Sequence, residues 1–234
     1  MIPIALAELR MLVRNRLVAV IALVMPLGIG AVLAFRSAPG AGGTVAALQL
    51  AITGALGVYV GAATTLASRR QTLFLKRLRS GAVADASIIG GLVLPIVAVA
   101  LAQLAIVFAM LGATAGAPAH PWLLAVGAVT TLAMFVALAL ATAGVTNSPE
   151  HAQVTTLPVF VVTLGATVWM TFTGSAELGW LKRALPGGSN AELMTIAWAG
   201  GDPAEGLLLA LPTLGWALAA VIAARVMFRW EPRI

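Results

Sequence analysis

The sequence predicts an all-α integral membrane protein with six transmembrane helices, and three observations support this. The chain of 234 residues is 61% hydrophobic and 9% charged, with a mean hydropathy of +1.02, which is typical of membrane proteins. Its apolar runs are long enough to cross a bilayer core, which takes about 20 helical residues. The basic residues gather on alternate connections between these runs. Because all connections are short, we expect residues 1–234 to form a single membrane domain.

The six predicted spans are separated by turns and short polar segments, and no charged residue lies near the middle of any of them. They are Leu17–Phe35, Val45–Ala67, Ile88–Leu111, Trp122–Val145, Val154–Phe172 and Leu207–Phe228. The first run is longer than the apolar region of a signal peptide, and no clear cleavage site follows it, so we expect it to remain as an uncleaved span. Prolines within four of the spans favour kinks, because proline removes a backbone hydrogen bond.

Residues 1–16 precede the first span and have an amphipathic pattern. Apolar residues recur at helical spacing and form one stripe, and Arg10 and Arg14 lie away from this stripe. The pattern predicts an interfacial helix, which could serve as a membrane anchor or as a docking element for another protein.

The connection between the second and third spans, residues 68–87, contains the most basic segment of the chain. Its sequence SRRQTLFLKRLRSG (Ser68–Gly81) holds five of the fourteen Lys and Arg residues. Wound as one helix, it places an apolar side opposite a basic side. The apolar side consists of Phe74, Leu75 and Leu78, and the basic side of Arg69, Arg70, Lys76, Arg77 and Arg79. We therefore expect this segment to lie at the cytoplasmic surface, in contact with lipid or with a protein.

The distribution of charge predicts the orientation of the chain. With the N-terminus in the cytoplasm, eleven Lys and Arg residues lie on the cytoplasmic side, and Arg36, Lys182 and Arg183 lie outside. This asymmetry matches the positive-inside rule and places both termini in the cytoplasm, with the chain in the cell's inner (cytoplasmic) membrane. The net charge of +6 is thus an orientation signal, and we expect no binding of nucleic acid.

Residues 173–206 form the longest outer connection and predict a helical hairpin. The pattern of Ala176–Leu185 predicts a short amphipathic helix that ends at Pro186-Gly187-Gly188. Ser189 with Glu192 has the pattern of a capping box that opens a second helix. Since Trp180 and Trp198 fall one on each helix, we expect the hairpin to rest in the outer membrane interface. Asn147 or Ser148 should cap the fifth span, and Asp202 the sixth.

The sequence has none of the usual signs of an enzyme. It contains no G-x-x-x-x-G-K-[ST] motif, so we expect that this chain does not hydrolyse ATP. It has no cysteine, no nucleophile triad and no cluster of metal-ligating residues, which predicts neither a catalytic nor a metal site. Ion-coupled carriers generally keep a charged side chain or a histidine within the bundle, and no predicted span has one near its middle. Uphill transport would therefore need energy from another subunit.

Neutral polar residues are concentrated on the second and fifth spans. These are Gln49, Thr53 and Thr64 on the second span, and Thr156, Thr163, Thr167 and Thr171 on the fifth. Spacings of four residues among threonine and glycine favour close helix packing. The same side chains could instead line a water-accessible cavity. Both interpretations remain open from the sequence.

Three segments together resemble the membrane subunit of ABC exporters of the type-2 permease family. ELRMLVRNRLVAVIALVMPLGIG (Glu8–Gly30) is similar to the family's basic lead-in helix and first span, and SRRQTLFLKRLRSG is similar to its cytoplasmic segment. Thr173-Gly174, GWLKRALP (Gly179–Pro186) and AELM (Ala191–Met194) resemble its outer hairpin. The chain departs from the pattern at Arg70 and Gln71, where the family has Glu and Gly, and at Gly81, which lies near the usual proline.

The resemblance implies a dimer with a second copy or a related permease, in the lipid bilayer, served by separate ATPase subunits. The ATP and Mg would be bound by those subunits, so no cofactor is expected in this chain. The expected ATPase contact residues are Arg10, Arg14, Arg69, Arg70, Phe74, Leu75, Arg77 and Leu78. The expected translocation path consists of Gln49, Thr53, Thr64, Thr156, Thr163, Thr167 and Thr171. The uncharged interior suggests a hydrophobic or amphiphilic cargo such as a drug, a peptide or a lipid.

The sequence is also compatible with two other functions. The chain could be an ATP-independent channel or facilitator. It could also be a structural or assembly subunit that transports nothing, with a basic segment that only anchors it to anionic lipid.

Overall fold

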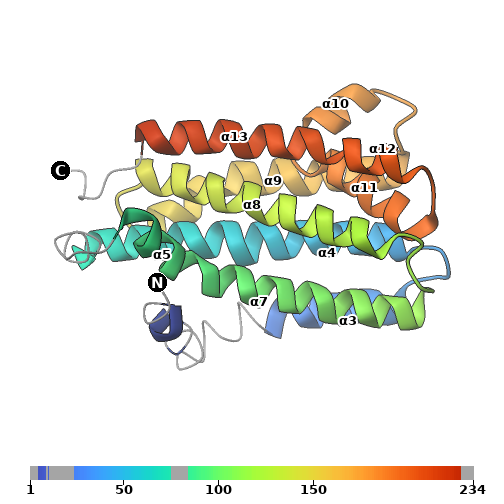
Figure 1. The fold of residues 1–234 in the computed structure, drawn as a ribbon, viewed down its shortest axis with the longest axis horizontal. Helices are drawn as coiled ribbons and strands as arrows, with labels where there is room; N and C mark the ends of the chain where they lie inside the picture. The colour runs from blue at the N-terminus through green and yellow to red at the C-terminus, as the bar shows by residue number, and fades with distance from the viewer. Residues whose placement is uncertain (1–4, 9, 11–23, 75–83, 228–234) are drawn as a thin grey trace.

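Five helices long and apolar enough to cross a membrane run side by side in the computed structural model, which describes residues 5–8, 10, 24–74 and 84–227 (Figure 1). They are Gly42–Gln71, Asp85–Thr114, Pro121–Val145, Pro149–Thr173 and Pro203–Met227. The described residues contain helices and loops and no strand. The prediction of an all-α chain with several helices long and apolar enough to span a membrane is therefore confirmed for the described residues.

The first predicted span is described only in part. Its described portion is α3 (Met25–Arg36), a helix of 12 residues, which packs against the second and third spans. Residues 17–23 lie outside the described ranges. The structure accordingly shows five helices of spanning length, and the sixth span stays a prediction.

The second span is built from three consecutive elements, α4 (Gly42–Ile52), the π-helix η2 (Thr53–Val60) and α5 (Gly61–Gln71). A π-helix has a wider turn than an α-helix and often occurs at functional positions. Within η2, the Tyr59 ring stacks on Phe135 of the fourth span with centroids 5.8 Å apart. The Tyr59 hydroxyl lies 2.8 Å from the Thr142 hydroxyl. The wide turn is thus fixed against the fourth span by an aromatic contact and a hydrogen bond.

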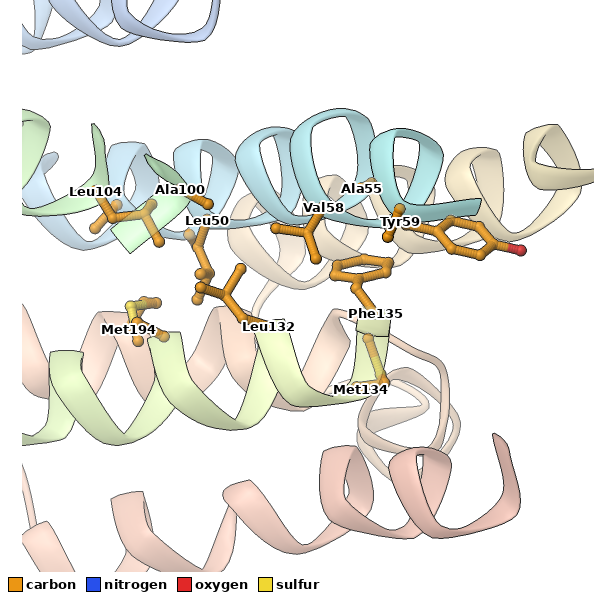
Figure 2. Packing of buried hydrophobic residues seen from close by; sticks show 14 of the residues in the cluster. Leu50, Ala55, Val58, Tyr59, Ala100, Leu104, Leu132, Met134, Phe135 and Met194 are labelled. Carbon is orange, nitrogen blue, oxygen red and sulfur yellow. The ribbon is translucent and has the colours of Figure 1, made fainter. Parts of the chain in front are cut away.

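The remaining spans are α7 (Asp85–Thr114), α8 (Pro121–Val145), α9 (Pro149–Thr173) and the pair α12 (Pro203–Leu208) and α13 (Ala210–Met227). Of these, α7, α8 and α9 pack against the second span, and α13 packs on the other side of α8. The α8 helix packs on η2 and α5 on one side and on α13 on another. Figure 2 shows Leu132 and Phe135 of α8 pointing towards Leu50 and Val58 of the second span. All four residues belong to the apolar core.

Two of the predicted helix caps are confirmed. The Ser148 hydroxyl accepts a hydrogen bond from the backbone N–H of His151 at the start of α9, with Pro149 in the first turn. The Asp202 carboxylate accepts one from the backbone N–H of Ala204 at the start of α12.

Residues 5–8 and the end of α13 lie at the same end of the bundle (Figure 1).

The outer hairpin consists of α10 (Gly179–Ala184) and α11 (Gly188–Ala199), and its predicted position is wrong for α11. This helix packs inside the bundle between α4, α8 and α9. Trp180 on α10 is 72% exposed, as an interfacial residue would be, but Trp198 on α11 is only 5% exposed. The hairpin therefore has one outer helix and one inserted helix.

Glycines on the neighbouring spans explain how α11 can enter the bundle. A Cβ atom at Gly42 of α4 would overlap the indole of Trp198, and one at Gly127 of α8 would overlap the end of Met194. Both backbones come close to α11 because they carry no side chain at these points. The predicted capping box is also wrong, since the N-cap is Gly187 and Ser189 contacts Thr213 instead, with their hydroxyl oxygens 3.3 Å apart.

Candidate functional site

Two polar residues of the second span, Gln49 at the end of α4 and Thr53 at the start of η2, form a small hydrogen-bonded group that joins this span to α3. The Nε2 amide of Gln49 donates to the carbonyl oxygen of Pro26 at 3.0 Å and to the Thr53 hydroxyl at 2.9 Å. Gln49 and Thr53 are fully buried. A Cβ atom at Gly30 would lie 2.9 Å from the Gln49 Oε1, so this glycine lets α3 approach the amide. In the described chain, the group therefore works as a contact between two helices.

The polar residues of α9 face a different neighbour, the turn of the outer hairpin. Thr163 and Thr167 are each 1% exposed, and their hydroxyl oxygens have no hydrogen-bond partner among the described residues. A Cβ atom at Gly187 would lie 2.7 Å from the Thr167 hydroxyl and 2.8 Å from the Thr163 carbonyl oxygen. The N-terminus of α11 thus closes directly over this part of the threonine stripe.

The other three predicted path residues bond to their own helices. Thr64 donates to the carbonyl oxygen of Val60 at 2.8 Å, Thr156 to that of Gln153 at 2.7 Å, and Thr171 to that of Thr167 at 2.8 Å. Thr156 is buried, whereas Thr64 and Thr171 are half-buried. These bonds are compatible with helix packing and with a cavity wall, because a hydroxyl bonded to its own helix fits both environments.

Sequence reasoning missed the polar residues that the inserted helix brings into the bundle. The Asn190 side-chain amide donates to the Thr131 hydroxyl of α8, and both residues are buried. The Asn190 Oδ1 has no partner among the described residues. No local sequence pattern indicates this contact, since it depends on α11 entering between α4, α8 and α9.

Two consecutive basic residues hold the hairpin in place. Lys182 is fully buried, and its ammonium group donates to the Thr173 hydroxyl at 2.7 Å and to the Gly174 carbonyl oxygen at 2.6 Å. It also lies 5.1 Å from the centre of the Trp169 ring. The C-terminus of a helix is the negative end of its dipole and favours such a cation. Lys182 therefore fixes α10 to the end of α9.

The next residue, Arg183, joins α10 to α11. Its guanidinium group donates two hydrogen bonds of 2.6 Å to the two carboxylate oxygens of Glu192, and it lies 3.5 Å from a carboxylate oxygen of Glu205. The hydrogen bonds to Glu192 raise the pKa of Arg183. Burial by itself would raise the pKa of Glu192, but the hydrogen bonds and charge of Arg183 outweigh burial and lower it. Glu192, which the sequence assigned to a cap, is thus part of an ion pair.

The predicted partner contact lies at the opposite end of the bundle. The Arg69 guanidinium forms an ion pair with the Glu8 carboxylate at 2.8 Å and lies 5.3 Å from the centre of the Phe74 ring. Arg10 is exposed. The lead-in segment and the segment after the second span therefore meet through Glu8 and Arg69. Glu8 was not among the predicted contact residues.

The prediction of one continuous helix over Ser68–Gly81 is wrong in its described part. The α5 helix ends at Gln71, and Leu73 has a φ of 58°, a left-handed conformation that commonly terminates helices. Arg70 is 1% exposed, so its side chain is buried in the protein and does not belong to the predicted basic surface. Of the other predicted contact residues, Arg14, Leu75, Arg77 and Leu78 lie outside the described ranges.

Comparison with known proteins does not add a family to these observations. No model of a known protein family matches the sequence, and no curated protein gives a significant match.

Proposed function

We propose that this chain is the membrane subunit of an ATP-driven exporter, with the architecture of the type-2 permeases that its sequence resembles. A partner ATPase would bind at the end of the bundle that carries residues 5–8, and a second permease subunit would complete the translocation path. The cargo would be hydrophobic or amphiphilic, in keeping with an interior that has neutral polar groups.

The observation that carries the proposal is the contact between Glu8 and Arg69. It joins two segments that the resemblance assigns to the ATPase contact, although they are 61 residues apart in the sequence. Phe74 lies beside Arg69 and is partly buried against the core. A force applied to these segments by a soluble partner would therefore reach the second span directly, because α5 is continuous with η2 and α4.

Co-purification with an ATPase tests this proposal. The chain should be expressed together with a candidate Walker-type ATPase and purified by a tag on the permease. We expect Arg10→Glu to reduce the yield of bound ATPase at least several-fold, because Arg10 is exposed and reversing its charge changes the surface without disturbing the core. Phe74→Asp should have a larger effect, because it also removes the ring that lies against the Arg69 guanidinium, which pairs with Glu8.

The matched control lies at the other end of the bundle. Trp180→Asp changes an aromatic residue that is 72% exposed on α10, and it should leave ATPase binding unchanged. Equal ATPase binding by the parent chain, Arg10→Glu and Phe74→Asp, all inserted normally, would refute the contact. Export that continues without the ATPase would favour a facilitator instead.

A further inference from the structure

The second span changes its hydrogen-bond register partway along its length. At the end of α4 the bonds are still α-helical, since the backbone N–H of Thr53 donates to the carbonyl oxygen of Gln49. The next eight residues, Thr53–Val60, form the π-helix η2, whose bonds join residues five apart. At Gly61, where α5 begins, the N–H donates to Val58, three residues back. Most π-helices are single turns within an α-helix, so a segment of this length needs support from its surroundings.

One side chain of α8 supplies such support near both ends of η2. The Phe135 ring lies against Gly54, where a Cβ atom would be 2.6 Å from the ring's Cδ2 atom. The same ring stacks on Tyr59, with centroids 5.8 Å apart. Figure 2 shows Phe135 pointing towards this part of the second span. All three residues are buried. Phe135 therefore contacts two residues of η2 that are five positions apart in the sequence.

The spacing between Gly54 and Tyr59 distinguishes a π-helix from an α-helix. In an α-helix with 3.6 residues per turn, residues five apart point about 140° away from each other around the axis. In a π-helix the hydrogen bonds join residues five apart, so such residues lie on the same side. Gly54 and Tyr59 can thus both face Phe135 while the segment is a π-helix, and not when it is an α-helix. The Tyr59 hydroxyl, 2.8 Å from the Thr142 hydroxyl of α8, holds the same register.

The side of η2 that faces away from Phe135 is packed less closely. Leu56 is 40% exposed. In the described chain, the nearest atom to the Cβ position of Gly57 belongs to Thr53 of the same segment, at 4.0 Å. The α register is also the one that the flanking elements α4 and α5 adopt. This side of η2 therefore leaves room for a change of winding, which the contact with Phe135 opposes.

From these contacts we infer that η2 is a conformational switch with two registers. It is a π-helix while the Phe135 ring contacts both ends of the segment, and it becomes an α-helix when this contact opens. An α-turn contains fewer residues than a π-turn, so the change turns α5 about its axis relative to α4.

The contacts of the two flanking helices decide which part moves. Gln49 of α4 is bonded to the carbonyl oxygen of Pro26 on α3, which keeps α4 in place. The turn of α5 therefore moves Arg69 in its last turn, and with it the ion pair to Glu8. The switch is a property of the second span and does not depend on the proposed function. It would operate in the same way in a facilitator.

Disulfide formation in the full-length protein in vesicles tests the switch. The chain has no cysteine of its own, so each introduced pair gives an unambiguous signal. The Cβ position of Gly61 lies 3.7 Å from the Cγ2 atom of Ile96 on α7, and a disulfide needs Cβ atoms about 3.5–4.5 Å apart. Ile96→Cys is combined with a cysteine substitution at each of residues 60–64 in turn. In the parent chain we expect the highest disulfide yield at Gly61.

Two variants that disturb the Phe135 contact should move this maximum. In Gly54→Ala the added Cβ atom displaces the Phe135 ring, and alanine also favours the α-helix more than glycine does. We expect the yield at Gly61 to fall several-fold and the maximum to move to another of residues 60–64, because a different side of α5 then faces Ile96. Phe135→Leu removes the ring without adding an atom to η2 and should move the maximum in the same direction.

Gly57→Ala is the matched control. It makes the same exchange within η2 and has the same gain in helix propensity, but its Cβ atom meets no other element of the described chain within 4 Å. The maximum should stay at Gly61. A maximum that also stays at Gly61 in both Gly54→Ala and Phe135→Leu would overturn the switch. A loss of disulfide at every position in both variants would overturn it as well, since it would show that the span unfolds and does not turn.

Discussion

The second and fifth spans carry similar polar pairs, but the structure gives them different partners, although the Gln49 Oε1 also has no partner in the described chain. Gln49 and Thr53 bond to each other, and Gln49 also bonds to Pro26 of α3. Thr163 and Thr167 are equally buried, yet their hydroxyl groups have no partner in the described chain. The first pair stabilises a contact between two helices. The second pair is covered by the turn of an inserted hairpin.

A stripe of small polar residues therefore does not define one environment. A buried hydroxyl without a partner costs free energy, whereas a bonded one contributes it. We therefore expect the α3–α4 contact to be a fixed part of the fold. The contact between α9 and α11 closes polar groups that would gain hydrogen bonds if α11 moved and water entered.

The largest effect is expected for Gly187→Ala, which disrupts the contact between α9 and α11. Gly187 has a φ of +95°, and a Cβ atom there would lie 2.7–2.8 Å from atoms of Thr163 and Thr167. The left-handed backbone costs about 1–2 kcal/mol for alanine, and forced overpacking a further 1–3 kcal/mol or so. We expect loss of α11 docking, measured as faster protease cleavage of the hairpin and a lower unfolding temperature.

Gly116→Ala is the control for this variant. Its φ of +93° is nearly the same, but no atom lies within 4 Å of its Cβ position. It should show the backbone cost without the overpacking cost. If both variants lose the same stability, the close contact of Gly187 with the threonine stripe has no energetic weight.

A smaller effect is expected for Gln49→Leu, which tests the bonded pair. The variant removes two hydrogen bonds and leaves the Pro26 carbonyl oxygen and the Thr53 hydroxyl with fewer partners. Hydrogen bonds between membrane helices average about 0.6 kcal/mol and reach about 1.7 kcal/mol, so we expect a loss of about 1–3 kcal/mol in a reversible unfolding assay. Thr53→Val removes only one of these bonds and should cost about half as much. Unchanged stability in Gln49→Leu would show that the pair is not structural.

The fold could be predicted from the sequence where local rules decide it. The apolar runs located the long helices, and the Ser148 and Asp202 caps followed from side chains that bond to the nearest backbone N–H groups. The position of α11 could not be predicted, because its composition fits an interfacial helix as well as an inserted one. Its insertion depends on Gly42 and Gly127 of two distant helices, and such a long-range fit has no local pattern.

The candidate site was predictable to a similar extent. The polar stripes could be located from helical spacing, and the structure buries Gln49, Thr53, Thr156, Thr163 and Thr167. Which neighbour each stripe contacts could not be predicted from spacing alone. The partners of Arg69 and Arg183 were also missed, since Glu8 and Glu192 come near them only through tertiary packing. Whether the buried threonines line a path stays a prediction.

The smallest effect on stability is expected for Thr163→Val and Thr167→Val, and this is what makes them informative. Valine has nearly the shape of threonine, and each substitution removes a hydroxyl that has no partner in the described chain. Removing an unsatisfied buried group relieves its desolvation cost, so stability should be unchanged or rise by up to about 1 kcal/mol. Thr156→Val is the control, because the Thr156 hydroxyl donates to the Gln153 carbonyl oxygen.

The functional result of these two variants then separates packing from a path. If α11 withdraws during transport, the hydroxyl groups of Thr163 and Thr167 meet water or cargo only in the open state, and valine would destabilise that state alone. Export, or cargo-stimulated ATP hydrolysis by the partner, should fall several-fold in the two variants while the unfolding temperature stays unchanged. A loss of stability as large as that of Thr53→Val would contradict the difference between the two spans. Normal stability together with normal export would assign the threonine stripe of α9 to packing alone.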